Sequence, residues 1–194
     1  MTELPDLVGW RAVILHRPDE SVDRIVRQLG LLGLSAHTQW APLDLGRTPA
    51  EIAFVDADQG WCGLLPWENG APPIPLVALL QSEAPGRVAW ALSQGAGAIL
   101  SKPVAAAAIY PALVLAVSVH RERASNAERH ALLEERIRMR PLVHGAVRAI
   151  MGCQHLDEDT AYRRLRLSAM GRRITMEQAA AEILAGVMQL PEAG

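Results

Sequence analysis

Short apolar runs alternate with helical stretches over the first hundred residues of the chain. The runs lie at residues 11–16, 34–38, 52–56, 75–80 and 98–101, and their composition is typical of strands. Between the first two runs, Val22, Ile25, Val26 and Leu29 recur at helical spacing, so this helix can pack one face on a sheet. The alternation predicts an α/β domain with a five-stranded parallel sheet. The proline-rich segment 61–75 should form a short, irregular connection.

Beyond Pro103 the strand pattern stops, and residues 105–140 have the pattern of one nearly continuous helix. Ile109, Leu113, Val117 and Ile137 belong to an apolar side, and arginines and glutamates supply a charged side. A helix of this length must bury its apolar stripe, and a second copy of itself is the simplest partner. We therefore expect a dimerising coiled coil.

Pro141 should end the long helix, because proline lacks the N–H that the helix interior needs. Three short helices should follow at residues 142–151, 157–170 and 175–188, the second with Asp157 as N-cap and the third with a Thr175–Gln178 capping box. Each has one apolar face, so together they predict a three-helix bundle. The apolar positions are Val143, Val147, Ile150 and Met151; Ala161, Leu165 and Ala169; and Met176, Ala180, Ile183 and Val187.

Charge is distributed unevenly along a chain whose net charge is −2. Residues 1–103 carry 7 basic and 11 acidic side chains, whereas residues 138–173 carry 8 arginines and 3 acidic side chains. A local positive field on an acidic protein is the electrostatic footprint of a nucleic-acid binder. No apolar stretch is long enough to span a membrane and the first residues do not resemble a signal peptide, so we expect a cytoplasmic protein without membrane contact.

The sequence holds no pattern that indicates catalysis. It has no phosphate-binding loop and no nucleophile motif, and Gly95-Ala96-Gly97 lacks the third glycine of a dinucleotide site. His144 and His155 are too far apart for a helical metal pair. We therefore expect no enzyme activity, no cofactor and no metal site.

The C-terminal helices resemble the ANTAR domain, an RNA-binding module of antitermination regulators. The resemblance rests on Ala146 and Met151 in the first helix and, in the second, on Ala161, Tyr162, the Leu165-Arg166 pair and the Ala169-Met170 pair. Many members of that family have lysine after the first alanine, where this chain has Val147, and Arg148 follows it. The domain plan expected from the resemblance is 1–103 for the α/β domain, 104–140 for the helix and 141–194 for the ANTAR domain.

The first domain resembles a response-regulator receiver, which has a flavodoxin-like five-stranded sheet with its chemistry at the carboxyl ends of the strands. Asp56 and Lys102 occupy two of the four positions that phosphorylation needs in that family. His16 and Arg17 stand where receivers have an acidic pair, and Leu80 stands where they have a hydroxyl. A site with one carboxylate beside an arginine should bind Mg²⁺ poorly. We interpret Asp56 and Lys102 as paired remnants of a phosphorylation site.

As a whole, the chain resembles the AmiR-type transcription antiterminators. The resemblance implies a dimer that binds hairpin loops in a leader mRNA. It also implies control through sequestration by a ligand-sensing negative regulator that resembles a periplasmic binding protein. Expected RNA contacts are an aromatic and arginine edge of the second helix, with further arginines around it. The candidate residues are Arg148, Tyr162, Arg163, Arg166, Arg172 and Arg173.

Two other functions compete with this interpretation. A phosphorylation-switched ANTAR response regulator would respond to Mg²⁺ and a phosphodonor. A protein-interaction module would use its basic helices against an acidic partner and would have no RNA target.

Overall fold

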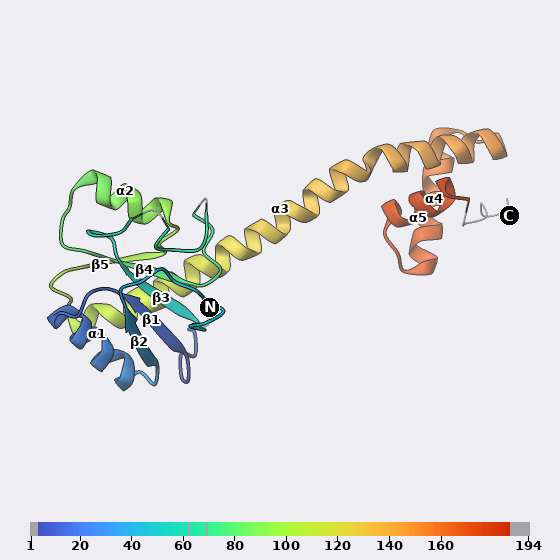
Figure 1. Ribbon diagram of the computed structural model, residues 1–194. Coiled ribbons are helices and arrows are strands. Elements are labelled where there is room, and N and C mark those ends of the chain that lie inside the picture. Colours follow the sequence, from blue (N-terminus) through green and yellow to red (C-terminus); the bar gives the residue numbers. More distant parts are fainter. Residues whose placement is uncertain (1–3, 62, 69, 187–194) are drawn as a thin grey trace. The chain divides into compact units, whose positions relative to one another are not determined.

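The N-terminal part of the protein is built on a parallel sheet (Figure 1). The computed structural model describes residues 4–61, 63–68 and 70–186. The strands are β1 (Arg11–Leu15), β2 (Ser35–Gln39), β3 (Ile52–Asp56), β4 (Leu76–Leu80) and β5 (Ala98–Ser101). All neighbouring strands pair in parallel in the order β2-β1-β3-β4-β5. This arrangement confirms the predicted five-stranded sheet.

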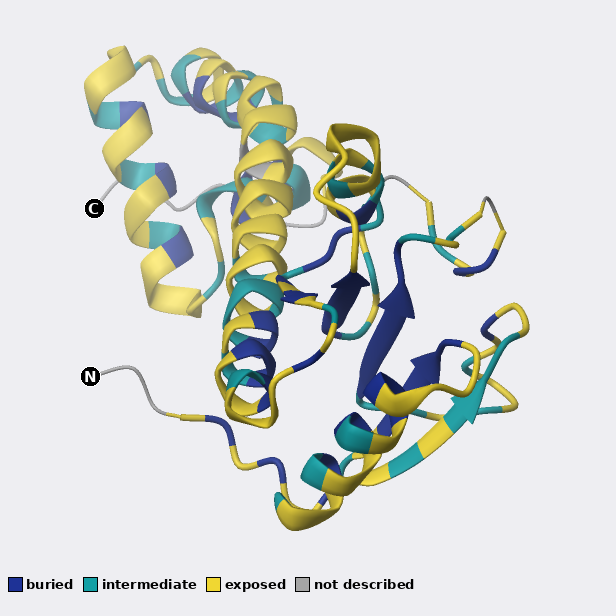
Figure 2. Ribbon diagram, turned by 90° about the vertical axis from the view of Figure 1, so that its left-hand side faces the viewer, coloured by how far each residue is buried: buried dark blue, intermediate teal, exposed yellow. Residues whose placement is uncertain are grey.

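Both faces of the sheet are covered, so β3 and β4 are buried along their whole length (Figure 2). Successive side chains of a strand point to opposite faces. Phe54 therefore packs in a core with helix α1 (Glu20–Leu31) and the first turns of helix α3 (Ala106–Gln154), whereas Val55 packs in a second core on the other face. That second core is closed by helix α2 (Pro85–Ser93) and by tryptophan-bearing loops.

Helices do not follow every strand. The irregular connection predicted at 61–75 is confirmed over its described residues, and the connection between β2 and β3 departs from the expected alternation of strands with helices. The connection between β2 and β3 and the described residues between β3 and β4 contain turns and no helix. Trp40 and Trp67 pack against the core there, and Trp67 Nε1 donates to the carbonyl of Gln94 at 3.0 Å. Large side chains on loops thus cover a face that helices would otherwise cover. The short helix α2 was not predicted.

Helix α3 continues through Pro141, so the predicted break at that residue is wrong (Figure 1). A proline in a helix interior costs about 3 kcal/mol, because one hydrogen bond is lost and the ring crowds the preceding turn. Half-buried Met139 precedes Pro141, and half-buried Leu142 and Val143 follow it, packed against the C-terminal core. We attribute the continuity to this packing, which offsets the cost of the proline.

The chain divides into two compact units, Met1–Ser125 and Asn126–Gly194, which we call the N-terminal and C-terminal units. In the N-terminal unit, Ile109 and Leu113 of α3 are fully buried, and Arg123 donates to the carbonyl of Gly95 at 2.6 Å. A side chain at Gly97 would meet the backbone of Ala116 at 2.9 Å, so glycine permits this close approach of helix and sheet.

The C-terminal unit is a bundle of the end of α3 with helices α4 (Glu158–Arg172) and α5 (Met176–Leu184). The predicted N-cap and capping box are both present, because Asp157 accepts from the backbone N–H of Thr160 and Thr175 pairs reciprocally with Gln178. Most of the core consists of alanines, so it is small. Val187, expected on the third apolar face, lies outside the described residues. The buried core residues are Ala146, Val147, Ile150, Ala161, Leu165, Ala169, Ala179, Ala180 and Ile183.

Candidate nucleic-acid interface

Helix α4 separates a buried stripe from an exposed edge. Ala161, Leu165 and Ala169 are spaced four residues apart and pack in the core. Tyr162 and Arg166 directly follow the first two, so they lie one turn apart on the flank of that stripe. Tyr162 keeps 45% of its surface exposed, and Arg166 is exposed as well. An aromatic ring and a guanidinium therefore face solvent side by side on one helix.

The other candidate arginines are all exposed, but they differ in the hydrogen bonds and ion pairs that they form within the protein. Arg163 is exposed on α4, and its Nε donates to the carbonyl of Asp159 at 3.3 Å. Arg172 forms an ion pair with Glu182 of α5, so part of its charge is already neutralised. Arg173 is the exposed C-cap of α4 in a left-handed conformation. Arg148 is exposed on α3, away from this helix in sequence.

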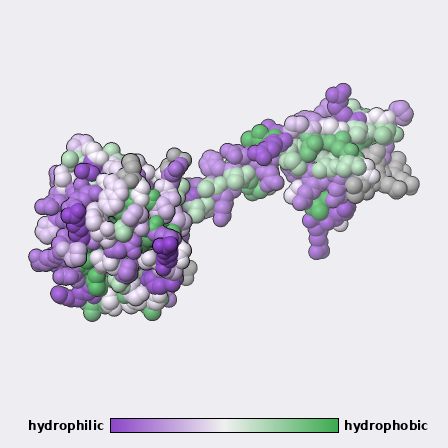
Figure 3. Space-filling model, viewed as in Figure 1, coloured by the Kyte–Doolittle hydropathy of each residue, from purple (hydrophilic) through white to green (hydrophobic). Residues whose placement is uncertain are grey.

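Large apolar side chains are also exposed on α4. Leu167 and Met170 are 66% and 63% exposed, although Met170 belongs to the residue pattern that resembles the ANTAR domain. The space-filling view shows hydrophobic residues gathered on the C-terminal unit among polar ones (Figure 3). Such a mixed surface can contact both the apolar faces of the bases and the charged phosphate backbone of a nucleic acid.

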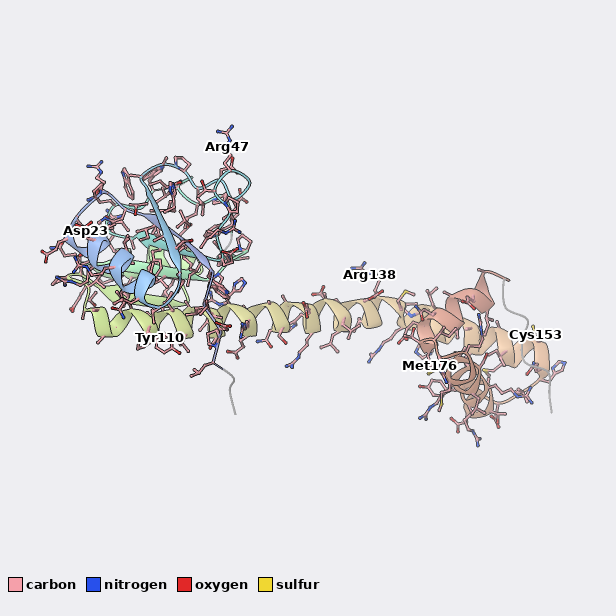
Figure 4. All side chains as sticks on the ribbon, turned by 90° about the horizontal axis from the view of Figure 1, so that it is seen from below. Asp23, Arg47, Tyr110, Arg138, Cys153 and Met176 are labelled. Atoms are coloured by element: carbon pink, nitrogen blue, oxygen red, sulfur yellow. The ribbon has the colours of Figure 1, made fainter. Side chains whose placement is uncertain are left out.

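A groove of about 530 Å³ lies within the C-terminal unit, between α3 and the first turns of α4 and α5. Its apolar lining comes from Val143, Val147 and Met176, the last of which is labelled in Figure 4. Tyr162 lines the same groove, so its side chain borders both the exposed edge of α4 and this hollow. Arg166 is not part of the lining.

Polar and ionisable side chains complete the lining of the groove. They are Arg140, His144, Glu158, Asp159 and Glu177. The three carboxylates stand in the first turns of α4 and α5, where the helix dipole favours negative charge. This groove was not predicted from the sequence, because it forms from three segments that only the folded bundle brings together.

In the N-terminal unit, the carboxyl ends of the strands hold a compact ionic cluster. Asp56 is 1% exposed, and Lys102 Nζ lies 3.0 Å from its Oδ1. Lys102 Nζ also lies 2.9 Å from Oδ2 of Asp58. Asp58 in turn accepts from the backbone N–H groups of Gln81 and Ser82 at 2.7 and 3.1 Å. The expected pairing of Asp56 with Lys102 is present, and Asp58, two residues after Asp56, is a member that the sequence analysis missed.

His16 takes the place of a carboxylate in this cluster and is itself buried. Its Nδ1 lies 2.6 Å from the carbonyl oxygen of Arg17, which can only accept, so Nδ1 is the donor. Its Nε2 lies 3.3 Å from Oδ2 of Asp56 and 3.2 Å from Nζ of Lys102. Asp56 Oδ2 has no hydrogen-bond partner among the described residues, because its approach to His16 does not have hydrogen-bond geometry.

Mutual pairing shifts the pKa values of the cluster. Burial alone would raise the pKa of Asp58, but hydrogen bonds from Lys102 and from the Gln81 and Ser82 backbones outweigh it and lower that pKa. Burial alone would likewise lower the pKa of Lys102, but hydrogen bonds and attraction from Asp58 and Asp56 raise it. The cluster therefore stabilises the charged forms of its own members.

Two further features are absent from the described residues, a metal-binding group of side chains and a membrane-spanning helix. These residues contain no group of three or more His, Cys, Asp or Glu side chains arranged to hold a metal ion. Within the same residues, no helix combines the length and apolarity needed to cross a membrane.

Comparison with known proteins covers both units. The family model described as "AmiR, N-terminal" matches residues 10–117, and the model of the ANTAR domain matches residues 131–184. The aliphatic amidase regulator of Pseudomonas aeruginosa is 27% identical over 186 residues, which cover 93% of this chain and 94% of that protein. The transcriptional regulatory protein PdtaR of Mycobacterium tuberculosis is 34% identical over 114 residues, 59% of this chain and 54% of that protein.

Among solved structures, the signal receiver domain of an HD domain-containing protein from Pseudomonas fluorescens Pf-5 aligns with 59% of this chain and 98% of its own. The TM-score is 0.48 and the identity 16%. The sheet order and the family models define the class of protein, a transcription regulator that joins a receiver-like domain to an ANTAR domain. Within that class, the chain belongs to the AmiR family of ANTAR regulators.

Proposed function

We propose that this regulator acts by transcription antitermination, as a dimer that binds hairpin loops in a leader mRNA. A ligand-sensing partner, rather than phosphorylation, controls it. The observation that carries the proposal is the exposed edge of α4, where Tyr162 and Arg166 stand one turn apart beside the buried stripe. A looped-out base can stack on the tyrosine ring while the guanidinium bonds a phosphate or a base edge.

Charge supports RNA as the target of the C-terminal unit. Arg163 and Arg166 are exposed and form no ion pair with a described residue. Unpaired guanidinium groups attract a phosphate backbone at long range, and counterion release then makes the binding sensitive to salt. Arg148, Arg172 and Arg173 would extend this basic surface around the edge.

Dimerisation through α3 is supported by its exposed apolar side chains. Leu132, Leu133 and Ile137 are 51%, 53% and 61% exposed. Leu133 and Ile137 are four residues apart, so they lie on one side of the helix. In Figure 4, Arg138 projects from the same segment. A second copy of α3 would bury these side chains in a coiled coil.

Control without phosphorylation is supported by the ionic cluster at Asp56. The carboxylate is buried and paired with Lys102, and His16 and Arg17 stand where a receiver would need acidic ligands for Mg²⁺. The similarity to the aliphatic amidase regulator covers nearly the whole of both chains. We therefore propose that a separate sensor resembling a periplasmic binding protein sequesters this chain and releases it when a small molecule binds.

Antitermination can be tested with the full chain and the leader transcript upstream of the genes beside its own. We expect binding to that transcript in gel-shift titrations and increased read-through of its terminator during transcription in vitro. The matched control is the same transcript with its loop nucleotides replaced and its stems kept. Equal binding to the control, without read-through of either transcript, would contradict the proposal.

The dimer is tested better by substitution than by truncation. Cutting the chain at residue 103 would remove Ile109 and Leu113 from the core of the N-terminal unit. Light scattering should instead show a dimer for the parent and a monomer for Leu133→Glu combined with Ile137→Glu. Glu134→Gln is the matched control. A double variant that stays dimeric would exclude this stripe as the principal interface.

Sensor control predicts a stable complex when this chain is produced together with the product of a neighbouring sensor gene. The complex should dissociate when the sensor's ligand is added. Read-through that does not change with the sensor, with or without ligand, would contradict this part of the proposal.

A further inference from the structure

We propose that the groove between α3 and the first turns of α4 and α5 receives one looped-out RNA base that carries N–H donors on its pairing edge. This inference rests on the proposed function and adds where a base is recognised and of what kind it is. The groove, together with the exposed edge of α4, would then supply selectivity for the loop sequence.

The groove is large enough to admit a base, and its lining suits one. Its volume of about 530 Å³ lies within the range of small-molecule sites, and Val143, Val147 and Met176 give it apolar walls. Tyr162 lines it and keeps nearly half of its surface exposed, so its ring can be covered further. A base extruded from a loop is a flat apolar body that proteins bind by stacking on such rings.

The carboxylates of the groove can accept hydrogen bonds from the edge of a base, and they repel a phosphate group. Glu158, Asp159 and Glu177 add three carboxylates, against the single guanidinium of Arg140; His144 completes the polar lining. Ionised carboxylates only accept hydrogen bonds, so they select groups that donate. Guanine presents two adjacent N–H groups on its pairing edge, and adenine and cytosine each present an amino group. Uracil presents a single N–H between two carbonyl oxygens, which the carboxylates would repel.

Arg140 completes the arrangement at the α3 side of the groove. Its guanidinium is exposed there, close enough to line the same hollow as the carboxylates. A nucleotide whose base enters the groove carries its phosphate at the mouth, where a cation is favourable and a carboxylate is not. The groove thus offers acceptors for the base and a donor for the backbone.

Removing one negative charge from the groove can either tighten or weaken RNA binding. The direction of that change distinguishes recognition of a base from general repulsion between carboxylates and phosphates. Glu177→Gln removes one negative charge and keeps the shape of the side chain. If Glu177 were only a solvated charge near RNA, the substitution would tighten binding of every RNA, because it relieves repulsion of phosphate. If Glu177 accepts from a base, the substitution weakens binding of the cognate loop.

The experiment uses the full chain and a hairpin enriched by it from a pool with randomised loop nucleotides. We expect Glu177→Gln and Asp159→Asn to weaken binding of that hairpin, by about tenfold for the residue that contacts the base. Replacing the recognised loop base by uridine should weaken the parent by a similar factor and the affected variant hardly at all. Glu134→Gln, exposed on α3 outside the groove, is the matched control and should not weaken binding.

Each outcome has a defined consequence, provided that thermal melts show the variants folded. Unchanged or tighter binding by both carboxylate variants, with the hairpin still bound by the parent, overturns the groove inference and leaves the proposed function standing. A loss of binding that is equal for all loop sequences overturns the groove inference as well. Failure to enrich any hairpin overturns the RNA function and this inference with it. If Glu177→Gln has a melting temperature far below the parent, Asp159→Asn alone decides the outcome.

Discussion

Lys102 and Arg166 are both cations, but their surroundings are opposite. Lys102 is enclosed by Asp56, Asp58 and His16, which leave 10% of its side chain exposed, and every one of these contacts lies within the N-terminal unit. Arg166 is exposed on α4 and forms no ion pair with a described residue. A cation satisfied by its own fold contributes to stability, whereas an exposed, unpaired cation is available to a partner. The charges of the first cluster thus serve structure, and those on α4 are available for recognition.

The largest effect should follow from removing the cation that pairs with buried Asp56. Lys102→Met leaves Asp56 buried without its principal partner, which should lower the free energy of unfolding by about 3–5 kcal/mol. All five tryptophans lie between residues 10 and 90, so their fluorescence during urea unfolding reports the N-terminal unit alone. Arg166→Met should change stability by less than about 0.5 kcal/mol. If both substitutions lower the free energy of unfolding equally, Lys102 does not contribute more to stability than Arg166, and the contrast between the two cations is wrong.

A slightly smaller effect is expected in the core of the C-terminal unit. Leu165 is fully buried, and Leu165→Ala should cost about 2–5 kcal/mol, because it leaves a cavity in a small core. Leu167, two residues further on and 66% exposed, is the matched control and should cost about 0.5 kcal/mol or less as alanine. Circular dichroism should show loss of helix for Leu165→Ala while the tryptophan signal stays unchanged. If Leu167→Ala lowers the free energy of unfolding as much as Leu165→Ala does, Leu167 must be buried in solution, and the exposed face assigned to α4 is wrong.

The ionic cluster also predicts a pH window for the N-terminal unit. The pKa of Asp58 is lowered from 3.8, so its stabilisation is present above that value and is lost as pH falls through the lowered pKa. The pKa of Lys102 is raised from 10.5, so its stabilisation is present below 10.5 and is lost as pH rises through the raised pKa. Lys102 is the only lysine of the chain, so no other lysine contributes to the alkaline loss. Unfolding monitored by tryptophan fluorescence should show this loss in the parent and not in Lys102→Met.

The smallest expected effect is that of a phosphodonor. Incubation with a small phosphodonor and Mg²⁺ should leave the intact mass of the protein unchanged, because Asp56 is buried and paired with Lys102, and His16 and Arg17 stand where a receiver has its acidic pair. A stoichiometric phosphate adduct that Asp56→Ala abolishes would show that the cluster can open. The N-terminal unit would then be a switch.

Much of this architecture could be predicted from local patterns. β3 and β4 follow from continuous apolar runs, which are typical of strands covered on both faces. The buried stripe of α4 follows from a spacing of four residues, which depends only on which face of the helix is buried. The Thr175–Gln178 capping box is equally local. Continuity of α3 through Pro141 could not be predicted, because local rules oppose it and the packing that offsets them comes from distant helices.

The candidate sites divide in the same way. Tyr162 and Arg166 could be placed on one edge from helical geometry alone, since both belong to α4. Asp58 and the groove at Glu177 could not, because each depends on segments far apart in the chain. The carboxylate of Asp58 is held in the cluster by the backbone N–H groups of Gln81 and Ser82, which follow β4. The sequence around β3 contains nothing that predicts these contacts.

RNA binding by the exposed edge of α4 is tested most directly by titrating the leader hairpin with the parent, Arg166→Ala and Tyr162→Leu at several salt concentrations. Arg166 lies outside the buried stripe, so its removal should keep the fold and weaken binding by about 1–3 kcal/mol if it contacts a base edge, or flatten the salt dependence if it contacts phosphate. Tyr162→Leu keeps an apolar side chain without the ring and should weaken binding without lowering the melting temperature. Variants that stay folded and bind as tightly as the parent at every salt concentration would contradict RNA recognition by this edge.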